Sequence, residues 1–225
     1  MLKKHINQIS YKIIGMLLSE NIRDFLKNIG PYQHIGLFYD TLEGKHSILF
    51  DYLSEGLNDG KGIVYVCYEE TPDEIRRGMS SFGIDVEPNE KAGNLVIHNG
   101  HEWYMLGSTI EPLRIINQWN ELYQRFHKKG LGMRVTGEVT GFFNEDRVSD
   151  LLRYEYALHK ILTIPMEALC SYNVNTIVKK GYSKMIMPLV KAHGMAIFTA
   201  KDNQMILEPE KTEGSDIENL LKIQI

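Results

Sequence analysis

The sequence has few cysteines and little excess of charge. Its 225 residues include only two cysteines, Cys67 and Cys170, each inside an apolar, strand-like run. Two thiols placed in this way form no disulfide framework, and they suit a reducing cytosol. The formal net charge is −4 and the basic doublets are scattered along the chain, which argues against general nucleic-acid binding. We therefore expect a cytoplasmic protein that does not bind nucleic acid directly.

Long apolar runs are missing as well. No run approaches the roughly 20 residues that a membrane-spanning helix needs. The short apolar run at residues 13–18 is not followed by a small-residue cleavage site. We interpret it as part of an amphipathic helix and not as a signal peptide, so we expect no membrane contact.

Signatures of common hydrolases are also missing. The sequence has no G-x-S-x-G, H-E-x-x-H or C-x-x-C pattern. Catalytic triads are recognised by geometry and not by order, so this absence alone does not exclude hydrolysis. A conventional hydrolase is nevertheless not the expected function.

The turn after the first predicted strand is where a nucleotide-binding protein would carry its phosphate-binding loop, and the residues of that loop are incomplete here. The first predicted strand runs into a Gly-Lys turn that opens a helix, and the pattern there would be G-x-x-x-x-G-K-[ST]. When the chain is aligned on Lys45, Tyr39 replaces the first glycine and His46 replaces the hydroxyl residue. Asp40 and Glu43 add two carboxylates that would repel a triphosphate, whose binding relies on bare backbone N–H groups. We expect one of these two carboxylates to neutralise Lys45.

Strand-like and helix-like segments alternate along the chain. Predicted strands cover residues 34–39, 63–68, 94–98, 133–138, 165–172 and 195–199. Predicted helices cover residues 45–57, 72–82, 111–129, 148–161 and 175–192, the last with breaks near Gly181 and Pro188. Thr71, Pro72 and Glu74 form a capping-box start for the second helix. Strands separated by helices of this length predict a parallel sheet covered on both faces.

The two ends of the chain differ from this alternating middle. Residues 5–28 have helical spacing, with a break at Ser19, and Gly30 and Pro31 then stop the helix. The tail from residue 201 is polar, with a short helix predicted at residues 217–223. We therefore divide the chain into a helical arm (1–30), an α/β domain (31–200) and a polar tail (201–225).

Several segments in this order resemble one family. They are residues 34–39, 57–66, 103–107, 133–138, 154–155 and 169–173. Together they resemble the MEDS domain, the sensory domain of methanogen and methylotroph regulators, over about residues 32–200. The resemblance implies a three-layer αβα fold with a mainly parallel central sheet. It also implies a relative of RecA/KaiC-type ATPases whose phosphate loop has degenerated, here with an added N-terminal helix.

The same resemblance implies a function. Such domains are proposed to sense small hydrocarbon derivatives in prokaryotic signal transduction, without catalysis, and they occur alone or joined to histidine kinases and DNA-binding transcription regulators. For this chain we expect a small organic ligand and a signalling protein as partners.

Candidate binding residues follow the predicted strands, because ligands of an open parallel sheet bind outside the carboxyl ends of its strands. They are Tyr39, Asp40, His46, Tyr68, Glu69, His98, Trp103, Tyr104, Glu138, Cys170 and Tyr172. Rings, imidazoles and carboxylates of this kind suit a small, partly apolar ligand with one or two polar groups.

Some of these residues have structural alternatives. Cys170 is better interpreted as a core residue, with a thiol facing the ligand as the alternative. Trp103 and Tyr104 are equally interpretable as core residues or as a lid over a pocket. Glu138 is interpretable as a ligand contact, a structural hydrogen-bond acceptor or a partner of Arg134.

A metal site has little support from spacing. His98 and His101 form an H-x-x-H pair that could bind a metal with Glu138 or Cys170. No third ligand lies at a diagnostic spacing, so we expect no metal, no cofactor and no catalytic residue. Glu155, within a predicted helix, is expected to be exposed or salt-bridged.

Two other functions stay open. The chain could be a residual nucleotide binder or slow ATPase that uses Lys45 and Glu138. It could also be an interaction module or homo-oligomeric scaffold assembled through the N-terminal helix.

Overall fold

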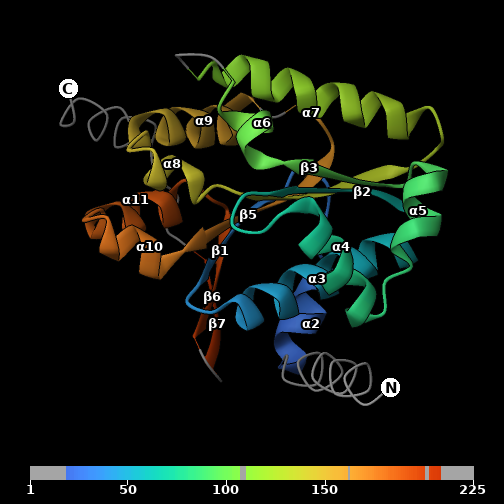
Figure 1. Cartoon of the computed structure of the whole chain (residues 1–225), viewed down its shortest axis with the longest axis horizontal. Helices are drawn as coiled ribbons and strands as arrows, with labels where there is room; N and C mark the ends of the chain where they lie inside the picture. Colours follow the sequence, from blue (N-terminus) through green and yellow to red (C-terminus); the bar gives the residue numbers. More distant parts are fainter. Residues whose placement is uncertain (1–18, 107–109, 162, 201–202, 209–225) are drawn as a thin grey trace.

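The fold is a seven-stranded sheet between two layers of helices (Figure 1). A computed structural model describes residues 19–106, 110–161, 163–200 and 203–208. The strands are β1 (His34–Tyr39), β2 (Lys61–Cys67), β3 (Leu95–Asn99), β4 (Gly132–Glu138), β5 (Met166–Asn173), β6 (Met195–Ala200) and β7 (Asn203–Leu207). The longer helices are α2 (Glu20–Lys27), α3 (Leu42–Asn58), α4 (Pro72–Phe82), α7 (Pro112–His127) and α9 (Val148–Ile161). The shorter ones are α5 (Val86–Ala92), α6 (Gly100–Tyr104), α8 (Gly141–Asn144), α10 (Val174–Lys179), α11 (Ile186–Lys191) and the 3₁₀ turn η1 (Ser183–Met185).

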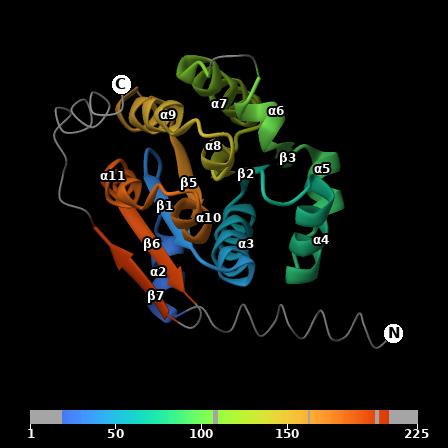
Figure 2. The ribbon, with the colours of Figure 1, turned by 60° about the vertical axis from the view of Figure 1, so that its left-hand side comes forward.

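The strand order is β3-β2-β4-β5-β1-β6-β7. The first six strands in this order pair in parallel, and β7 pairs with β6 in the antiparallel direction at the sheet edge (Figure 2). Because Tyr39 pairs with Asn173, and Glu138 with Ser171, the ends of β1, β4 and β5 lie side by side. The predicted three-layer αβα architecture with a mainly parallel sheet is confirmed.

Each face of the sheet has its own apolar core. Side chains of α2, α3, α4 and α5 pack against one face, and those of α6 to α11 pack against the other (Figure 1). Successive residues of β1 alternate between the two cores: Leu37 and Tyr39 belong to the first, and Phe38 to the second. Burial on both faces explains why the strands read as continuous apolar runs in the sequence.

Local sequence signals set several helix ends as predicted. The Thr71 side chain accepts a hydrogen bond from the backbone N–H of Glu74, and the Glu74 carboxylate accepts one from the backbone N–H of Thr71. Gly83 ends α4 with a φ of 111°, a conformation that glycine adopts without a Cβ clash. Ser19, where a helix break was predicted, caps α2 by accepting a hydrogen bond from the backbone N–H of Ile22.

Other expectations were wrong or fall outside the described residues. The segment expected to be a polar tail contains the strand β7. A strand at the edge of a sheet can keep alternate residues polar, because one of its faces is exposed to solvent. Pro188 lies in the first turn of α11 and does not break it, since a backbone N–H has no intrahelical acceptor there. Trp103 and Tyr104 lie in the short helix α6 and not in a loop. The helical predictions for residues 5–18 and 217–223 lie outside the described residues.

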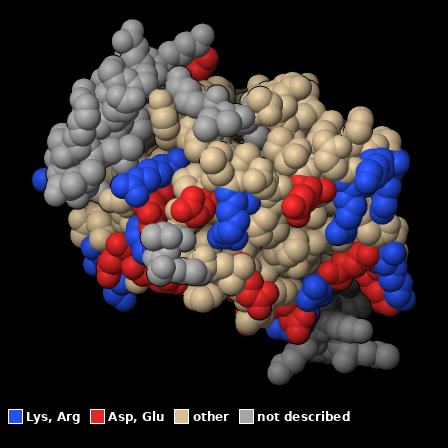
Figure 3. Space-filling model, turned by 90° about the horizontal axis from the view of Figure 1, so that it is seen from above, with Lys and Arg blue, Asp and Glu red and all other residues tan. Residues whose placement is uncertain are grey.

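The length and hydropathy of the described helices, and the charges on one face of the surface, bear on membrane crossing. None of the described helices combines the length and the hydropathy that crossing a bilayer requires. On the face seen in Figure 3, Lys and Arg side chains are interspersed with Asp and Glu.

Candidate functional site

One polar cluster lies where β2 and β4 end and α3 begins. We call Lys45, Glu69, Glu70 and Glu138 the Lys45 cluster. The hydroxyl of Thr41 caps α3 by accepting a hydrogen bond from the backbone N–H of Gly44, which places Lys45 in the first turn of the helix. The three glutamates follow β2 or end β4, on neighbouring strands of the sheet.

The ammonium group of Lys45 is buried among these carboxylates. Its Nζ atom lies 2.7 Å from Glu138 Oε1, 2.8 Å from Glu70 Oε2 and 3.7 Å from Glu69 Oε2, and its side chain is 0% exposed. Burial acts to lower the pKa of Lys45, but the charges of Glu138 and Glu70 outweigh it, so the pKa lies above its ordinary value. Asp40 and Glu43, expected to neutralise Lys45, form no ion pair with it in the described structure.

Glu138 uses both carboxylate oxygens. Oε1 accepts hydrogen bonds from Lys45 Nζ and from the Tyr65 hydroxyl, each at 2.7 Å. Oε2 accepts the backbone N–H groups of Tyr68 and Glu69, both at 2.7 Å. A carboxylate of the chain therefore takes the ammonium and backbone donors that a bound anion would use.

Glu70 and Glu69 complete the cluster from the other side. His46 Nε2 lies 2.6 Å from Glu70 Oε2. Burial acts to raise the pKa of Glu70, but the hydrogen bond with His46 and the charge of Lys45 lower it to about 2. Glu69 accepts hydrogen bonds from the Tyr39 hydroxyl and from Asn173 Nδ2, the latter at 2.8 Å. Three carboxylates thus surround one ammonium group. Their excess negative charge would repel a polyphosphate.

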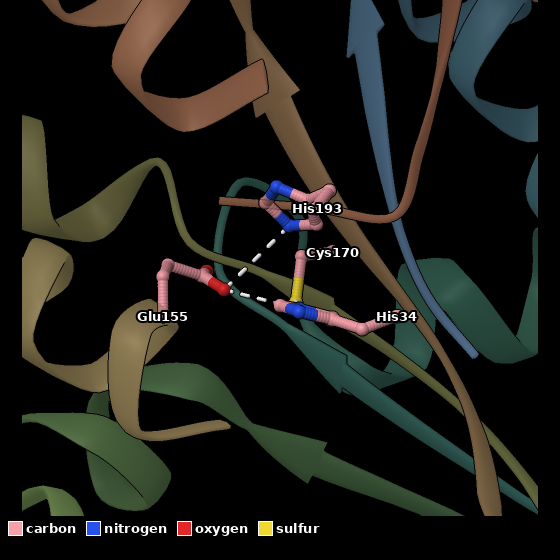
Figure 4. Close-up of side chains that lie close together, drawn as sticks. All are labelled: His34, Glu155, Cys170 and His193. Carbon is pink, nitrogen blue, oxygen red and sulfur yellow. Dashed lines mark hydrogen bonds and ion pairs between the residues drawn. The ribbon is translucent and has the colours of Figure 1, made fainter. Parts of the chain in front are cut away.

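A second polar cluster lies on the opposite face of the sheet. We call His34, Glu155, Cys170 and His193 the His34 cluster. Figure 4 shows these side chains pointing toward one another from β1, α9, β5 and the segment before β6. All four are buried, and one ligand-type atom from each lies within 4.8 Å of those from the others.

The contacts inside the His34 cluster are short. His34 Nε2 lies 3.3 Å from Cys170 Sγ and 3.1 Å from Glu155 Oε2, and His193 Nε2 lies 3.6 Å from the same Glu155 oxygen. The orientation of the His34–Glu155 pair is not that of a hydrogen bond, and Glu155 Oε2 accepts no well-aligned hydrogen bond among the described residues. The Cys170 thiol lies near enough to the Glu155 carboxyl group to interact with it as a donor. This carboxylate oxygen and these imidazole nitrogens face one common point.

Neighbouring groups fix the orientation of the His34 cluster. His193 Nδ1 lies 2.7 Å from the carbonyl oxygen of Leu189, and the Tyr172 hydroxyl donates to Glu155 Oε1 at 2.6 Å. A Cβ at Gly36 would lie 3.3 Å from the His193 ring, so a glycine there lets the ring approach the sheet.

Burial favours the uncharged forms of the groups in the His34 cluster. It lowers the pKa of His34 to about 3, with a further contribution from His159, and that of His193 to about 3, with a further contribution from His34. It raises the pKa values of Glu155 and Cys170, which favours their protonated forms. No side chain of the His34 cluster carries a permanent positive charge like that of the Lys45 ammonium group.

A narrow internal gap lies beside Cys170. It lies between side chains of β4, β5, α7 and α9, and in this conformation it is too narrow to hold a water molecule. Tyr104, Trp119 and Tyr154 are among its walls. The Tyr104 hydroxyl is buried against Gly137 and has no well-oriented hydrogen-bond partner among the described residues.

The structure divides the predicted site residues among different places. Tyr39, His46, Glu69 and Glu138 meet in or beside the Lys45 cluster, and Tyr68 joins it through its backbone N–H. Cys170 and Tyr172 belong to the His34 cluster or contact it. Trp103 and Tyr104 are buried in the core, and His98 lies against Trp103 with ring centroids 4.7 Å apart. Asp40 is half-buried and contacts Asn175 through its backbone carbonyl.

Some predicted pairings were wrong. Arg134 does not contact Glu138; its Nε lies 2.5 Å from Glu167 Oε2. Glu155, expected to be exposed or salt-bridged, is fully buried and lies 3.1 and 3.6 Å from His34 and His193. His101 is exposed and lies 3.6 Å from Glu145, away from the groups proposed to share a metal with it.

His34, Glu155 and His193 are site residues that were not expected from the sequence. They come from three elements and converge only through the sheet register and the packing of α9. No spacing pattern in the sequence could have identified them. The available signal was a histidine at the start of β1, His34, and another two residues before the neighbouring β6, His193.

Comparison with known proteins supports the relationship suggested by the sequence. The family model described as "MEthanogen/methylotroph, DcmR Sensory domain" matches residues 33–193, more than half of the chain. A search of curated proteins found no match. A KaiC-like protein from the hyperthermophilic archaeon Pyrococcus horikoshii OT3 has a similar crystal structure, with a TM-score of 0.53 and 14% sequence identity over 80% of this chain and 79% of that chain. At this identity the similarity shows the fold alone.

Proposed function

Because this chain belongs to the MEDS family of sensory domains, we propose that it senses a small organic molecule and does not hydrolyse nucleotides. The observation that supports this most is the state of Lys45. Its ammonium group, at the start of α3, is held by Glu138 and Glu70 at 2.7 and 2.8 Å. A polyphosphate would have to displace two carboxylates and then lie beside them.

The ligand we propose is a small hydrocarbon derivative with one polar group. The carboxyl ends of the strands were expected to bind it, but the polar side chains there already bond to one another. The gap beside Cys170 offers apolar and aromatic walls together with the Tyr104 hydroxyl, which has no well-oriented hydrogen-bond partner among the described residues. This combination matches the usual lining of small-molecule sites, so we place the ligand there.

Ligand entry at this gap would change the shape of the protein. The gap is too narrow for water in the present conformation, so an entering molecule must separate α7 or α9 from the sheet. A ligand that binds the opened form better shifts the population toward it. That shift is the signal we propose for transmission to a protein partner.

The two tryptophans allow a direct test. They are Trp103 and Trp119, with ring centroids 4.7 Å apart, and Trp119 lines the gap. We expect short-chain alcohols, amines, thioethers or alkyl halides to include a compound that changes tryptophan fluorescence saturably and raises the melting temperature. The proposal fails if Mg²⁺-ATP is the only compound that raises the melting temperature.

A matched pair of substitutions locates the ligand. Ala168 lines the gap, whereas Ala196 is an equally buried alanine of β6 outside it. Ala168→Leu should abolish the response to the compound, and Ala196→Leu should retain it if the variant folds. Equal responses from both folded variants would place the ligand elsewhere.

A further inference from the structure

We propose that His34, Glu155, Cys170 and His193 bind a divalent transition metal ion of the zinc class. The site differs from the H-x-x-H pair considered in the sequence, and it stands independently of the ligand proposed for the gap. Two imidazoles, a thiol and a carboxyl group are the donor types that Zn²⁺ uses in proteins.

Three of the six donor–donor distances are close to those of tetrahedral coordination, and all six are within 4.8 Å. Metal–ligand bonds of about 2.0–2.3 Å place neighbouring donor atoms of a tetrahedral zinc site roughly 3.3–3.8 Å apart. The corresponding separations here are 3.1 Å for His34 and Glu155, 3.3 Å for His34 and Cys170, and 3.6 Å for His193 and Glu155. Small side-chain shifts would bring all four donor atoms onto one ion.

Charge balance favours a divalent ion. Zn²⁺ bound by one thiolate, one carboxylate and two neutral imidazoles forms a neutral unit, which a buried site tolerates. The thiol proton, and the carboxyl proton where Glu155 carries one, go to solvent as the metal binds. No electron transfer is involved.

Contacts around the donors have the form found at metal sites. The contact between His193 Nδ1 and the Leu189 carbonyl requires the proton on Nδ1, so the lone pair of Nε2 faces the cluster. The Tyr172 hydroxyl donates to Glu155 Oε1 and leaves Oε2 directed at the metal position. His34 Nδ1 is buried without a partner among the described residues, so only His193 has its tautomer set by a neighbour.

Four protein ligands would close the coordination sphere, which is the arrangement of structural zinc sites. The ion would join β1, α9, β5 and the segment that leads into β6. Metal binding would therefore stabilise the layer of helices that covers the gap beside Cys170.

The test uses the full chain, expressed without a histidine tag and never exposed to chelator. Elemental analysis should find about one zinc per chain, and zinc added to chelator-treated protein should raise its melting temperature. Replacement with Co²⁺ should give the visible absorption of a tetrahedral site and a sulfur-to-cobalt charge-transfer band, because Cys170 is a donor. Tight binding without the sulfur band would overturn the site, as would the absence of any bound metal.

Matched variants separate this site from adventitious binding. Cys170→Ser should remove the sulfur band, whereas Cys67→Ser should retain it, since Cys67 is buried on the other face of the sheet. His101→Gln removes an exposed histidine and should leave the metal content unchanged. Loss of zinc in His101→Gln, or of the sulfur band in Cys67→Ser, would contradict the proposal. If Cys170→Ser does not fold, the spectrum of the unmodified cobalt protein decides.

Discussion

The two faces of the sheet treat buried polar groups in opposite ways. In the Lys45 cluster, one ammonium and three carboxylates bond to one another, and every oxygen of Glu138 has a donor. In the His34 cluster, two neutral imidazoles, a thiol and a carboxyl group converge, and Glu155 Oε2 accepts no well-aligned hydrogen bond among the described residues.

This difference indicates which of the two clusters can accept a ligand from solvent. Buried polar groups are costly unless they are paired. The Lys45 cluster is paired by the chain itself, so an incoming anion gains nothing there. The His34 cluster lacks a cation, so it is the place where an ion from solvent would gain most.

The largest effect is expected from removing the cation of the Lys45 cluster. Lys45→Met should destabilise the protein by about 3–5 kcal/mol, because it leaves buried carboxylates without their partner. Denaturant unfolding at pH 7 measures this. Lys91→Met is the control, since Lys91 is exposed and pairs with Glu87 on the surface; it should cost about 0.5 kcal/mol or less. Equal costs for the two variants would contradict the charge-paired description.

The second effect depends on pH. The pKa of Glu70 is about 2 in the folded protein and 4.5 in its unperturbed form. Its ionised form therefore stabilises the fold above pH 4.5, and this contribution is lost as the pH falls toward 2. Glu70→Gln should cost on the order of 2–3 kcal/mol at pH 7.

The difference between the wild type and Glu70→Gln should shrink as acid protonates Glu70. Urea unfolding of both proteins across this range would show it. A difference that stays constant from pH 7 to the acid limit would mean that the Glu70 carboxylate is not held by Lys45 and His46.

The third effect concerns the gap on the His34 face. A Cβ at Gly137 would lie 2.2 Å from the Tyr104 hydroxyl oxygen, whereas the next atom of that ring is 3.5 Å away. Gly137→Ala should therefore cost about 1–3 kcal/mol. Tyr104→Phe removes the clashing atom, so the double variant should recover most of the loss. Additive costs in this double-mutant cycle would show that Tyr104 does not contact Gly137.

The smallest effect is expected at Glu155. In metal-free protein, Glu155→Gln should change stability by less than about 1 kcal/mol, because its neighbours are neutral and no ion pair is lost. Thermal unfolding in chelator measures this. The contrast with Glu70→Gln sharpens the comparison. The same type of substitution should lower the free energy of unfolding substantially on one face of the sheet and change it little on the other. A large cost at Glu155 would mean that its carboxylate is charge-paired.

Much of the fold could be predicted from the sequence, since local signals set the elements. Thr71 and Glu74 fixed the start of α4, and the apolar runs located the strands of the parallel sheet. The antiparallel β7 was missed because its pairing with β6 is decided by the edge of the finished sheet and not by its own pattern.

The candidate site could be predicted only in part. Residues that follow strands, such as Glu69 and Glu138, were identifiable because strand ends share one edge of a parallel sheet. Which of them pair was not identifiable: Glu70 and Glu138, and not Asp40 or Glu43, hold Lys45. The convergence of His34, Glu155 and His193 depends on how α9 packs, which has no local signal.

The most direct test of the central claim is a calorimetric titration of Mg²⁺-ATP into the wild-type protein. The account predicts no saturable heat at millimolar nucleotide, because Glu138 and Glu70 already hold the Lys45 ammonium. A saturable isotherm would contradict it, since a nucleotide would then have displaced the carboxylates of the chain.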